Sequence, residues 1–256
     1  MPIFRLVEDT VFPPPDYADP SGLIAIGGDL SSERLLEAYR VGIFPWYSED
    51  QPLLWWSPDP RFVLELDNFK ISRSLQKTLR RGIFHVTFDR VFEDVIAACS
   101  VVAREGQSGT WITPEMQQAY VHLHGLGFAH SVESWFEGEL VGGLYGVSLG
   151  KAFFGESMFH RKNDASKIAL AILVEKLKVW GFHFIDSQMT TDHMYRLGAR
   201  EISRRIFLKK LQSALRHSTK RGKWHVEDCN EIYEFLSLPL PSGACSTLRI
   251  SASRDF

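Results

Sequence analysis

The chain has 256 residues, a mass of 29.2 kDa and a formal net charge of −2. Hydrophobic residues make up 45% of it and charged residues 23%, which excludes disorder throughout and supplies apolar material for one large domain or two smaller ones. The longest apolar run, residues 168–174, is too short to cross a bilayer, and the acids and prolines near the N-terminus do not fit a signal peptide. Because the three cysteines are widely spaced and form no disulfide framework, we expect a reducing cytoplasm.

Charge is unevenly distributed along the chain. Residues 1–67 contain twelve acids and four arginines, whereas residues 70–81 carry a net charge of +5 and residues 200–223 a net charge of +8. Two basic segments in a mildly acidic chain are typical of a local surface that binds a polyanion. The alternative is two solvated helix faces.

The first part of the chain predicts short helices and one rigid loop. A glycine-rich segment at 22–30 precedes a helix that Ser31 caps, that runs to Arg40 and that Gly42 ends. Residues 43–60 hold five aromatic residues among four prolines, which forbids a regular helix and predicts a loop. We expect a short strand at 61–66 and then a helix that Ser72 caps.

The next segments predict two more helices and then a change to β-structure. One helix is expected from Asp89 to Ala103, and another begins with Thr113 as its cap and Pro114 in its first turn. Residues 131–136, 140–150 and 151–159 are β-rich runs separated by glycine-containing turns, which predicts an antiparallel meander. Asn163 or Asp164 then caps an apolar helix over 165–180, followed by a strand at 183–188 and a helix over 203–217.

This order of elements predicts an α+β fold. We expect a small N-terminal domain over 1–62, a larger domain with a mixed, mainly antiparallel sheet over 63–228, and a C-terminal tail over 229–256 to which we assign no role.

Two motifs that suggest catalysis or metal binding do not hold in this context. Residues 146–150 match the G-x-S-x-G pattern of serine hydrolases, but that motif needs a strand-to-helix turn and the chain here continues as strand. A hairpin is therefore predicted around Gly150. His122 and His124 are two residues apart on a helix and point in different directions, so no metal site is predicted.

Three polar residues stand out in apolar strands. Asp186 and Gln188 are two residues apart, so the pleat of a strand would project both from one face. Glu156 lies inside the apolar run 153–159, where a carboxylate needs a cation or a hydrogen-bond donor. For all three residues the alternative is a strand with one solvated face.

The tryptophans have two interpretations. Trp55 and Trp56 are expected in the core. Trp46 and Trp111 lie between turn signals, and there a side chain that stacks on an unpaired nucleobase is an alternative to a core side chain.

Taken in order, several segments resemble the bacterial leucyl/phenylalanyl-tRNA–protein transferases. The resemblance covers about residues 1–210, and its segments are GLIAIGGDL, GIFPWY, LLWWSPDPR, GTWIT, ELVGGLYGVSLG, FFGESMF, NDASK, FIDSQ and HMYRLGA. It implies that the larger domain resembles a GNAT-like acyltransferase. It also implies transfer of Leu or Phe, and sometimes Met, from aminoacyl-tRNA to proteins with an N-terminal Arg or Lys, which marks those proteins for degradation. No cofactor, metal or membrane partner is implied.

The resemblance also implies roles for individual residues. The catalytic pair falls on Asp186 and Gln188. The positions that hold the 3′-terminal adenosine and the reacting ends are Trp46, Trp111, Phe153 and Glu156. The hydrophobic pocket for the donor amino acid falls on Leu144, Leu170, Leu173, Leu177 and Ile185. We place tRNA binding on the basic face of the helix after Ser72, at Arg73, Lys77, Arg80 and Arg81.

The predicted pocket agrees with helix periodicity. Leu170, Leu173 and Leu177 fall on one helix face, and Ile185 is on the next strand, although a plain helix–sheet core has the same pattern. Two other functions remain open at this point. A small-molecule GNAT acetyltransferase would need a glycine-rich pyrophosphate loop, and residues 161–164 contain no glycine. A non-catalytic aminoacyl-tRNA-binding protein would have the same pocket and the same basic helices.

Overall fold

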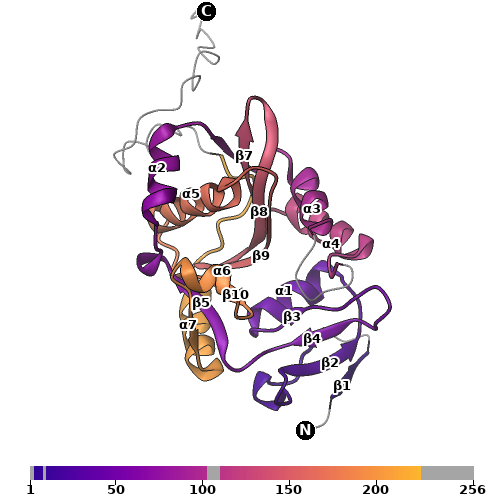
Figure 1. Cartoon of the computed structure of the whole chain (residues 1–256). Helices are drawn as coiled ribbons and strands as arrows, with labels where there is room; N and C mark the ends of the chain where they lie inside the picture. The colour runs from indigo at the N-terminus through magenta and orange to yellow at the C-terminus, as the bar shows by residue number, and fades with distance from the viewer. Residues whose placement is uncertain (1–2, 8–9, 103–109, 226–256) are drawn as a thin grey trace, which may run out of the picture.

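The computed structural model describes residues 3–7, 10–102 and 110–225, which form two β-sheets with helices around them (Figure 1). The smaller sheet has the strand order β1-β2-β4-β3 and consists of β1 (Phe4–Leu6), β2 (Leu23–Gly27), β3 (Phe44–Pro45) and β4 (Leu54–Trp56). The larger sheet has the order β11-β5-β10-β9-β8-β7-β6. Its strands are β5 (Arg61–Glu65), β6 (His85–Phe88), β7 (Ala129–Phe136), β8 (Glu139–Leu149), β9 (Ala152–His160), β10 (Phe184–Gln188) and β11 (Arg200–Ile202).

Within the described residues, every pairing of the larger sheet is antiparallel except that of β9 with β10. A mixed, mainly antiparallel sheet beside a small N-terminal sheet confirms the predicted α+β class.

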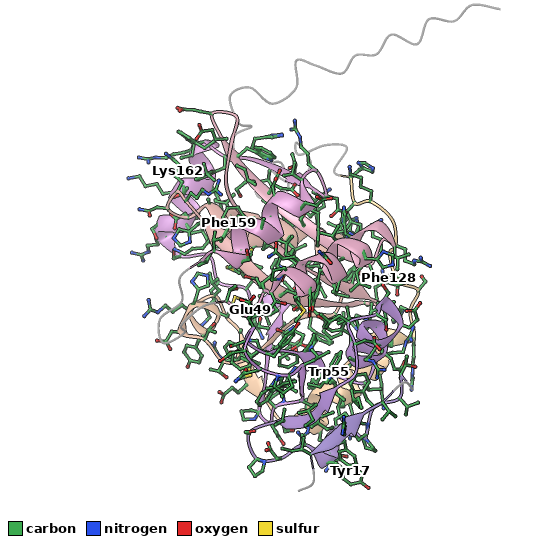
Figure 2. The ribbon with its side chains drawn as sticks, turned by 90° about the vertical axis from the view of Figure 1, so that its right-hand side faces the viewer. Tyr17, Glu49, Trp55, Phe128, Phe159 and Lys162 are labelled. Atoms are coloured by element: carbon green, nitrogen blue, oxygen red, sulfur yellow. The ribbon has the colours of Figure 1, made fainter. Side chains whose placement is uncertain are left out.

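Helices cover both faces of the larger sheet (Figure 1). The α-helices of the described residues are α1 (Ser32–Arg40), α2 (Arg73–Arg81), α3 (Phe92–Ser100), α4 (Pro114–Gly125), α5 (Ala165–Val179), α6 (Asp192–Arg196) and α7 (Arg204–Leu215). The two short 3₁₀-helices are η1 (Pro15–Tyr17) and η2 (Leu66–Asn68). Apolar side chains of α2 and α5 belong to one core cluster, and those of α1, α3, α4 and α7 belong to the other. Figure 2 shows Tyr17 and Trp55 at the N-terminal end of the molecule and Lys162 at the opposite end. No described helix is long and apolar enough to cross a membrane.

The caps predicted at Ser31, Ser72 and Thr113, and the helix start predicted at residue 203, are confirmed. Ser31, Ser72, Thr113 and Ser203 each accept a hydrogen bond from the backbone N–H three residues later, which satisfies a donor that the first helical turn leaves open. The meander is confirmed as well, because β7, β8 and β9 pair in sequence. The turn between β8 and β9 contains Gly150 at φ 56°, and Ser148 is a buried strand residue, so the hairpin interpretation of residues 146–150 is correct.

Other local predictions were wrong. The third helix begins at Phe92 rather than Asp89, because β6 precedes it and Asp89 forms a bend with φ 52°. The loop at 43–60 contains the short strands β3 and β4. Asp164 is the N-cap residue of α5, as one of the two alternatives predicted, but its side chain makes no capping hydrogen bond and accepts from Thr78 and Lys167 instead. The expected helix end at residue 103 and the tail over 229–256 lie outside the described residues.

Candidate active site

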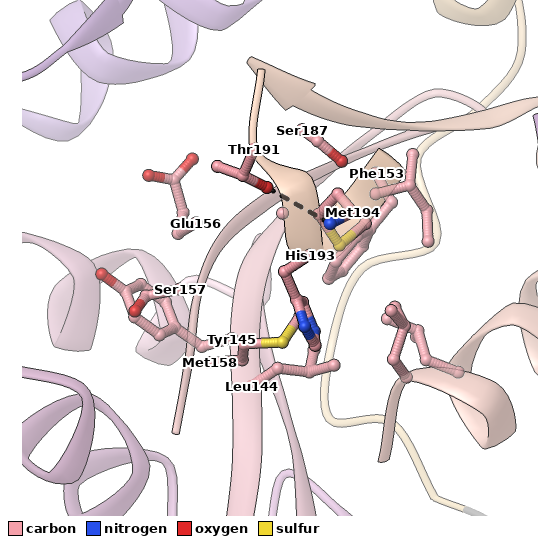
Figure 3. A pocket seen from close by; sticks show the side chains of 14 residues that line it. Leu144, Tyr145, Phe153, Glu156, Ser157, Met158, Ser187, Thr191, His193 and Met194 are labelled. Atoms are coloured by element: carbon pink, nitrogen blue, oxygen red, sulfur yellow. Dashed lines mark hydrogen bonds between the residues drawn. The ribbon is translucent and has the colours of Figure 1, made fainter. Parts of the chain in front are cut away.

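An apolar cavity of about 300 Å³ lies between α5 and strands β8, β9 and β10 (Figure 3). Four of the five side chains predicted for the donor pocket line it, namely Leu144, Leu170, Leu173 and Ile185. Leu177 is fully buried but does not line the cavity, because it lies one helical turn beyond Leu173 and packs into the core. The cavity therefore does not extend to Leu177, and a place for this residue in the donor pocket stays a prediction.

The wall of this apolar cavity also contains residues that the sequence did not single out for it. Phe153 and Glu156, predicted to contact the reacting ends, are part of this wall. The unpredicted lining residues are Tyr145, Gly155, Ser157, Met158, Ser187, Thr191, His193 and Met194. Burial, reinforced by the positive charge of Lys167, lowers the pKa of His193, so its imidazole is neutral at physiological pH.

A second, wider cavity of about 730 Å³ adjoins the first. Trp46 and Trp111 line it, as do Phe44 and Gln188. Four residues line both cavities, namely Glu156, Ser187, Thr191 and His193. The structure therefore places an apolar chamber next to a tryptophan-lined one, with Glu156 at the boundary. Trp111 is buried. Of the two tryptophans expected in the core, Trp55 is fully buried, whereas Trp56 is half-buried and packs against the core from outside.

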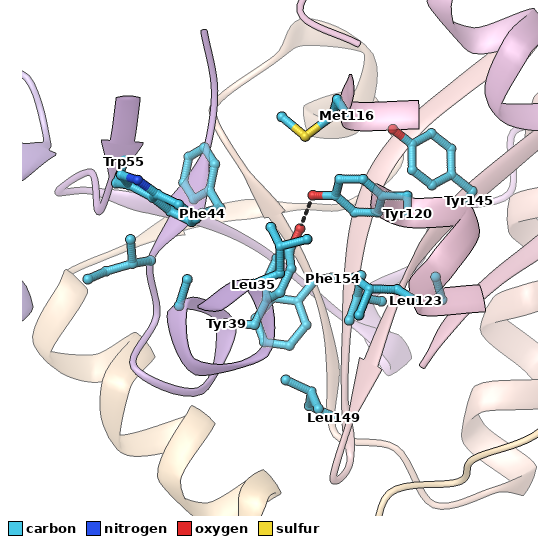
Figure 4. Packing of buried hydrophobic residues seen from close by; sticks show 14 of the residues in the cluster. Leu35, Tyr39, Phe44, Trp55, Met116, Tyr120, Leu123, Tyr145, Leu149 and Phe154 are labelled. Atoms are coloured by element: carbon cyan, nitrogen blue, oxygen red, sulfur yellow. Dashed lines mark hydrogen bonds between the residues drawn. The ribbon is translucent and has the colours of Figure 1, made fainter. Parts of the chain in front are cut away.

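Glu156 accepts hydrogen bonds from three donors. The Tyr39 hydroxyl and Gln188 Nε2 donate to Oε1 at 2.7 and 2.8 Å, and the Tyr120 hydroxyl donates to Oε2 at 3.1 Å. The two phenol oxygens also contact each other (Figure 4). These donors confirm that a carboxylate in this apolar run needs hydrogen-bond partners. Burial nevertheless outweighs them and raises the pKa of Glu156 to about 7, so both protonation states are populated near neutral pH.

Asp186 is fully buried and forms an ion pair with Arg61. Arg61 Nε donates to Oδ1 at 2.9 Å and Nη2 donates to Oδ2 at 2.7 Å, so the pairing is bidentate. The Asp186 side chain lines neither cavity. Its charge is therefore neutralised inside the protein rather than directed toward either cavity.

Strand alternation does not describe the end of β10. The pairing of β10 with β5 shifts register between Asp186 and Gln188, and Gln188 adopts φ 60°. This left-handed conformation is uncommon for a residue other than glycine and costs about 1 kcal/mol or more. The Gln188 N–H donates to Asp186 Oδ1 at 3.0 Å, and its side chain reaches the second cavity and Glu156. The two residues are thus brought together by a bulge and a hydrogen bond and not by the regular pleat that we expected.

Comparison with known proteins assigns the family. A family model described as "Leucyl/phenylalanyl-tRNA protein transferase" matches residues 63–212, and one for the N-terminal domain of the same family matches residues 28–59. A curated leucyl/phenylalanyl-tRNA–protein transferase of Myxococcus xanthus is 58% identical over 88% of this chain and 97% of the relative. One of Syntrophobacter fumaroxidans is 58% identical over 90% and 98%. The chain belongs to the leucyl/phenylalanyl-tRNA–protein transferase family. It is thus similar to aminoacyltransferases along most of its length, and its enzymatic class is that of an aminoacyltransferase.

One solved structure is similar to this chain only remotely. The structure titled "The structure of L-PGS from Bacillus licheniformis" aligns with a TM-score of 0.36 and 14% identity over 81% of this chain and 69% of that chain, and no conclusion follows from it.

The basic helix α2 of this transferase is exposed on the side predicted for tRNA. Arg73, Lys77, Arg80 and Arg81 are exposed, while Leu75 and Leu79 pack inward. In the other basic segment several cations have internal partners. Arg204 donates to the Ser57 carbonyl, and Lys210 pairs with Glu65 at 2.7 Å. Other cations of that segment, among them Arg205, Lys209 and Arg216, are exposed, so both basic segments offer charge to a polyanion.

Three residues of the transferase site had no signal in the sequence. Tyr39, Tyr120 and Arg61 come from α1, α4 and β5, and their contacts at the site join residues that are 36 to 125 positions apart. Hydrophobic periodicity and motif spacing relate only residues that are close in the sequence. These three residues are therefore identified only by their positions in the folded protein. Among the described residues no cluster of three or more His, Cys, Asp or Glu could hold a metal ion.

Proposed function

We propose that the protein transfers Leu or Phe, and also Met, from aminoacyl-tRNA to the N-terminal Arg or Lys of acceptor proteins. The transfer tags those proteins for degradation by the N-degron pathway in the cytoplasm, and the larger domain acts as a GNAT-like acyltransferase. The observation that supports this proposal best is the aliphatic cavity that meets Glu156 at the border of a wider, tryptophan-lined one.

The apolar cavity suits the donor amino acid. Its wall combines leucine and isoleucine side chains with two flexible methionines, Met158 and Met194. A charged donor side chain would lose its hydration there at a cost of several kcal/mol. Leu, Phe and Met differ only in apolar volume, which such a cavity discriminates weakly. The wall therefore favours a class of apolar donors over one particular amino acid.

The wider cavity suits the tRNA end and the acceptor. Trp46 and Trp111 offer aromatic faces on which the 3′-terminal adenine stacks, an interaction of about 1–3 kcal/mol per base. Two acidic residues, Glu156 and Asp192, line the same cavity. Their charge favours an acceptor whose first residue is Arg or Lys.

The reaction is aminolysis of the ester that joins the amino acid to the tRNA. The acceptor α-amino nitrogen attacks the ester carbonyl carbon, the new C–N bond forms, the C–O bond to the ribose breaks, and a proton from the nitrogen goes to the ribose oxygen. An α-amino group with a pKa of about 8 is partly neutral at physiological pH, so positioning supplies most of the acceleration.

Gln188 is the residue that we place against the attacking amine. Because Gln188 Nε2 donates to Glu156, the amide carbonyl oxygen is left to accept a hydrogen bond from the amine. An amide oxygen is too weakly basic to keep the proton, which passes to the ribose oxygen directly or through water. Asp186 orients Gln188 through the backbone N–H. We do not assign to Asp186 the direct stabilisation of positive charge on the amine, since Arg61 already neutralises it.

The test is incubation of the protein with radiolabelled Phe-tRNA and an Arg-initiated peptide. The proposal predicts labelled peptide, and none when the same peptide carries an acetylated N-terminus. Labelled tRNA that is bound without any peptide product would indicate a binding protein. Acetylation of a small amine from acetyl-coenzyme A, without transfer from tRNA, would indicate an acetyltransferase.

A further inference from the structure

We propose that Arg61 is a positioning residue for aminoacyl transfer, which acts through Asp186 to hold Gln188 in its reactive geometry. Because this role presupposes that Gln188 contacts the attacking amine, it depends on the function proposed above.

The guanidinium of Arg61 is held on all sides. The side chain is fully buried, with Nε and Nη2 on Asp186 and Nη1 donating to the Gly42 carbonyl at 3.2 Å. The rings of Phe44 and Phe207 lie 4.7 and 4.4 Å from its central carbon. Cation–π contacts and a bidentate carboxylate leave the plane of the group no alternative orientation. Arg61 therefore connects the loop after α1 to β10.

This restraint passes from Arg61 to Asp186. Oδ1 of Asp186 accepts from Arg61 Nε and from the Gln188 N–H, and Oδ2 accepts from Arg61 Nη2. With the carboxylate plane fixed by two parallel bonds, Oδ1 remains directed at the Gln188 backbone. That hydrogen bond compensates for the positive φ of Gln188, which in turn aims its side chain at Glu156 and the wider cavity.

A lysine at position 61 separates positioning from charge. Arg61→Lys keeps a cation beside Asp186 but loses the two-pronged geometry, so the carboxylate can rotate away from the Gln188 N–H. Since misplacement by about 1 Å can cost a factor of 10² in rate, we expect kcat for peptide formation to fall about 10- to 100-fold. The KM for Phe-tRNA should stay within about threefold, because neither cavity is lined by Arg61.

The matched control is Arg34→Lys. Arg34 is also fully buried and pairs with a carboxylate, Asp29, at 3.2 Å, but it lies in α1 away from both cavities. Arg34→Lys should lower the midpoint temperature of thermal unfolding and leave kcat for peptide formation unchanged. Arg61→Lys with wild-type kcat would overturn the proposal.

A second variant tests the same role if Arg61→Lys does not fold. Arg61→Met combined with Asp186→Leu removes both charges, and such apolar replacements of buried ion pairs commonly fold. We expect a folded protein in which kcat remains low, because the Gln188 N–H has lost its acceptor. Recovery of both the thermal midpoint and kcat would show that the pair is only structural. Full activity of Gln188→Ala would instead refute the function assigned to Gln188, and the two failures are thus distinguishable.

Discussion

Replacing Glu156 with glutamine should stabilise the protein in a pH-dependent manner. The folded-state pKa of Glu156 is about 7, raised mainly by burial, against an ordinary value of 4.5. Between pH 4.5 and 7 the carboxyl group is therefore mostly ionised in the unfolded chain and mostly protonated in the folded protein. The free energy of unfolding falls as the pH rises through this interval. Each pKa unit corresponds to about 1.4 kcal/mol, so the ionised carboxylate lowers the free energy of unfolding by roughly 3 kcal/mol above pH 7.

Urea unfolding of Glu156→Gln and of the wild-type protein at pH 5 and pH 8 measures this effect. Glutamine keeps an oxygen that Tyr39 or Gln188 can donate to but carries no charge at either pH. We expect the stability of the variant relative to wild type to increase by up to about 3 kcal/mol from pH 5 to pH 8. The control is Glu139→Gln at an exposed position, where we expect no such change. A constant difference for Glu156→Gln, or one that changes in the opposite direction, would refute the reasoning.

Three further predictions concern tRNA binding, the donor pocket and the core. Replacing Arg73, Lys77 and Arg80 together with alanine should weaken tRNA binding. In filter binding, the magnitude of the negative slope of log affinity against log salt should fall by up to about 2–3. An unchanged slope would move the tRNA surface to residues 200–223. Leu173→Ala enlarges the apolar cavity and so favours the larger Phe side chain over Leu. The ratio of kcat/KM for Phe-tRNA to kcat/KM for Leu-tRNA should therefore rise, and a fall would contradict the assignment of the donor pocket. Trp224→Ala removes a fully buried indole and should cost about 3–5 kcal/mol in urea unfolding, whereas a loss below about 1 kcal/mol would show that its packing contributes little.

Local chemistry explains which parts of the fold were predictable. The capping serines and the threonine before Pro114 act within one turn, and the glycine at 150 acts within one hairpin, so short windows of sequence contain the whole signal. The helix α6 was missed because it has only five residues, and β6 because it has four. Five residues make little more than one helical turn, and four make only two repeats of a strand, so neither α6 nor β6 has enough periodicity to be recognised.

The site was predictable only in part. Periodicity placed Leu170 and Leu173 on one helix face, and both line the apolar cavity. It placed Leu177 on the same face, but this residue lies one turn further along the helix and is buried in the core. The apolar strand around Glu156 predicted that donors must surround the carboxylate, yet nothing identified Tyr39 and Tyr120 as those donors. Contacts between distant segments are set by the tertiary fold, which one sequence without its relatives does not display.

The most direct test of the account is the kcat of Gln188→Ala in peptide formation from Phe-tRNA, measured beside binding of the same tRNA. Gln212→Ala, an exposed position on α7, is the matched control. The account predicts that Gln188→Ala lowers kcat by about 10²-fold or more, as expected when a group that positions the reactants is lost, while tRNA binding and the control remain at wild-type levels. Wild-type turnover by Gln188→Ala would contradict it.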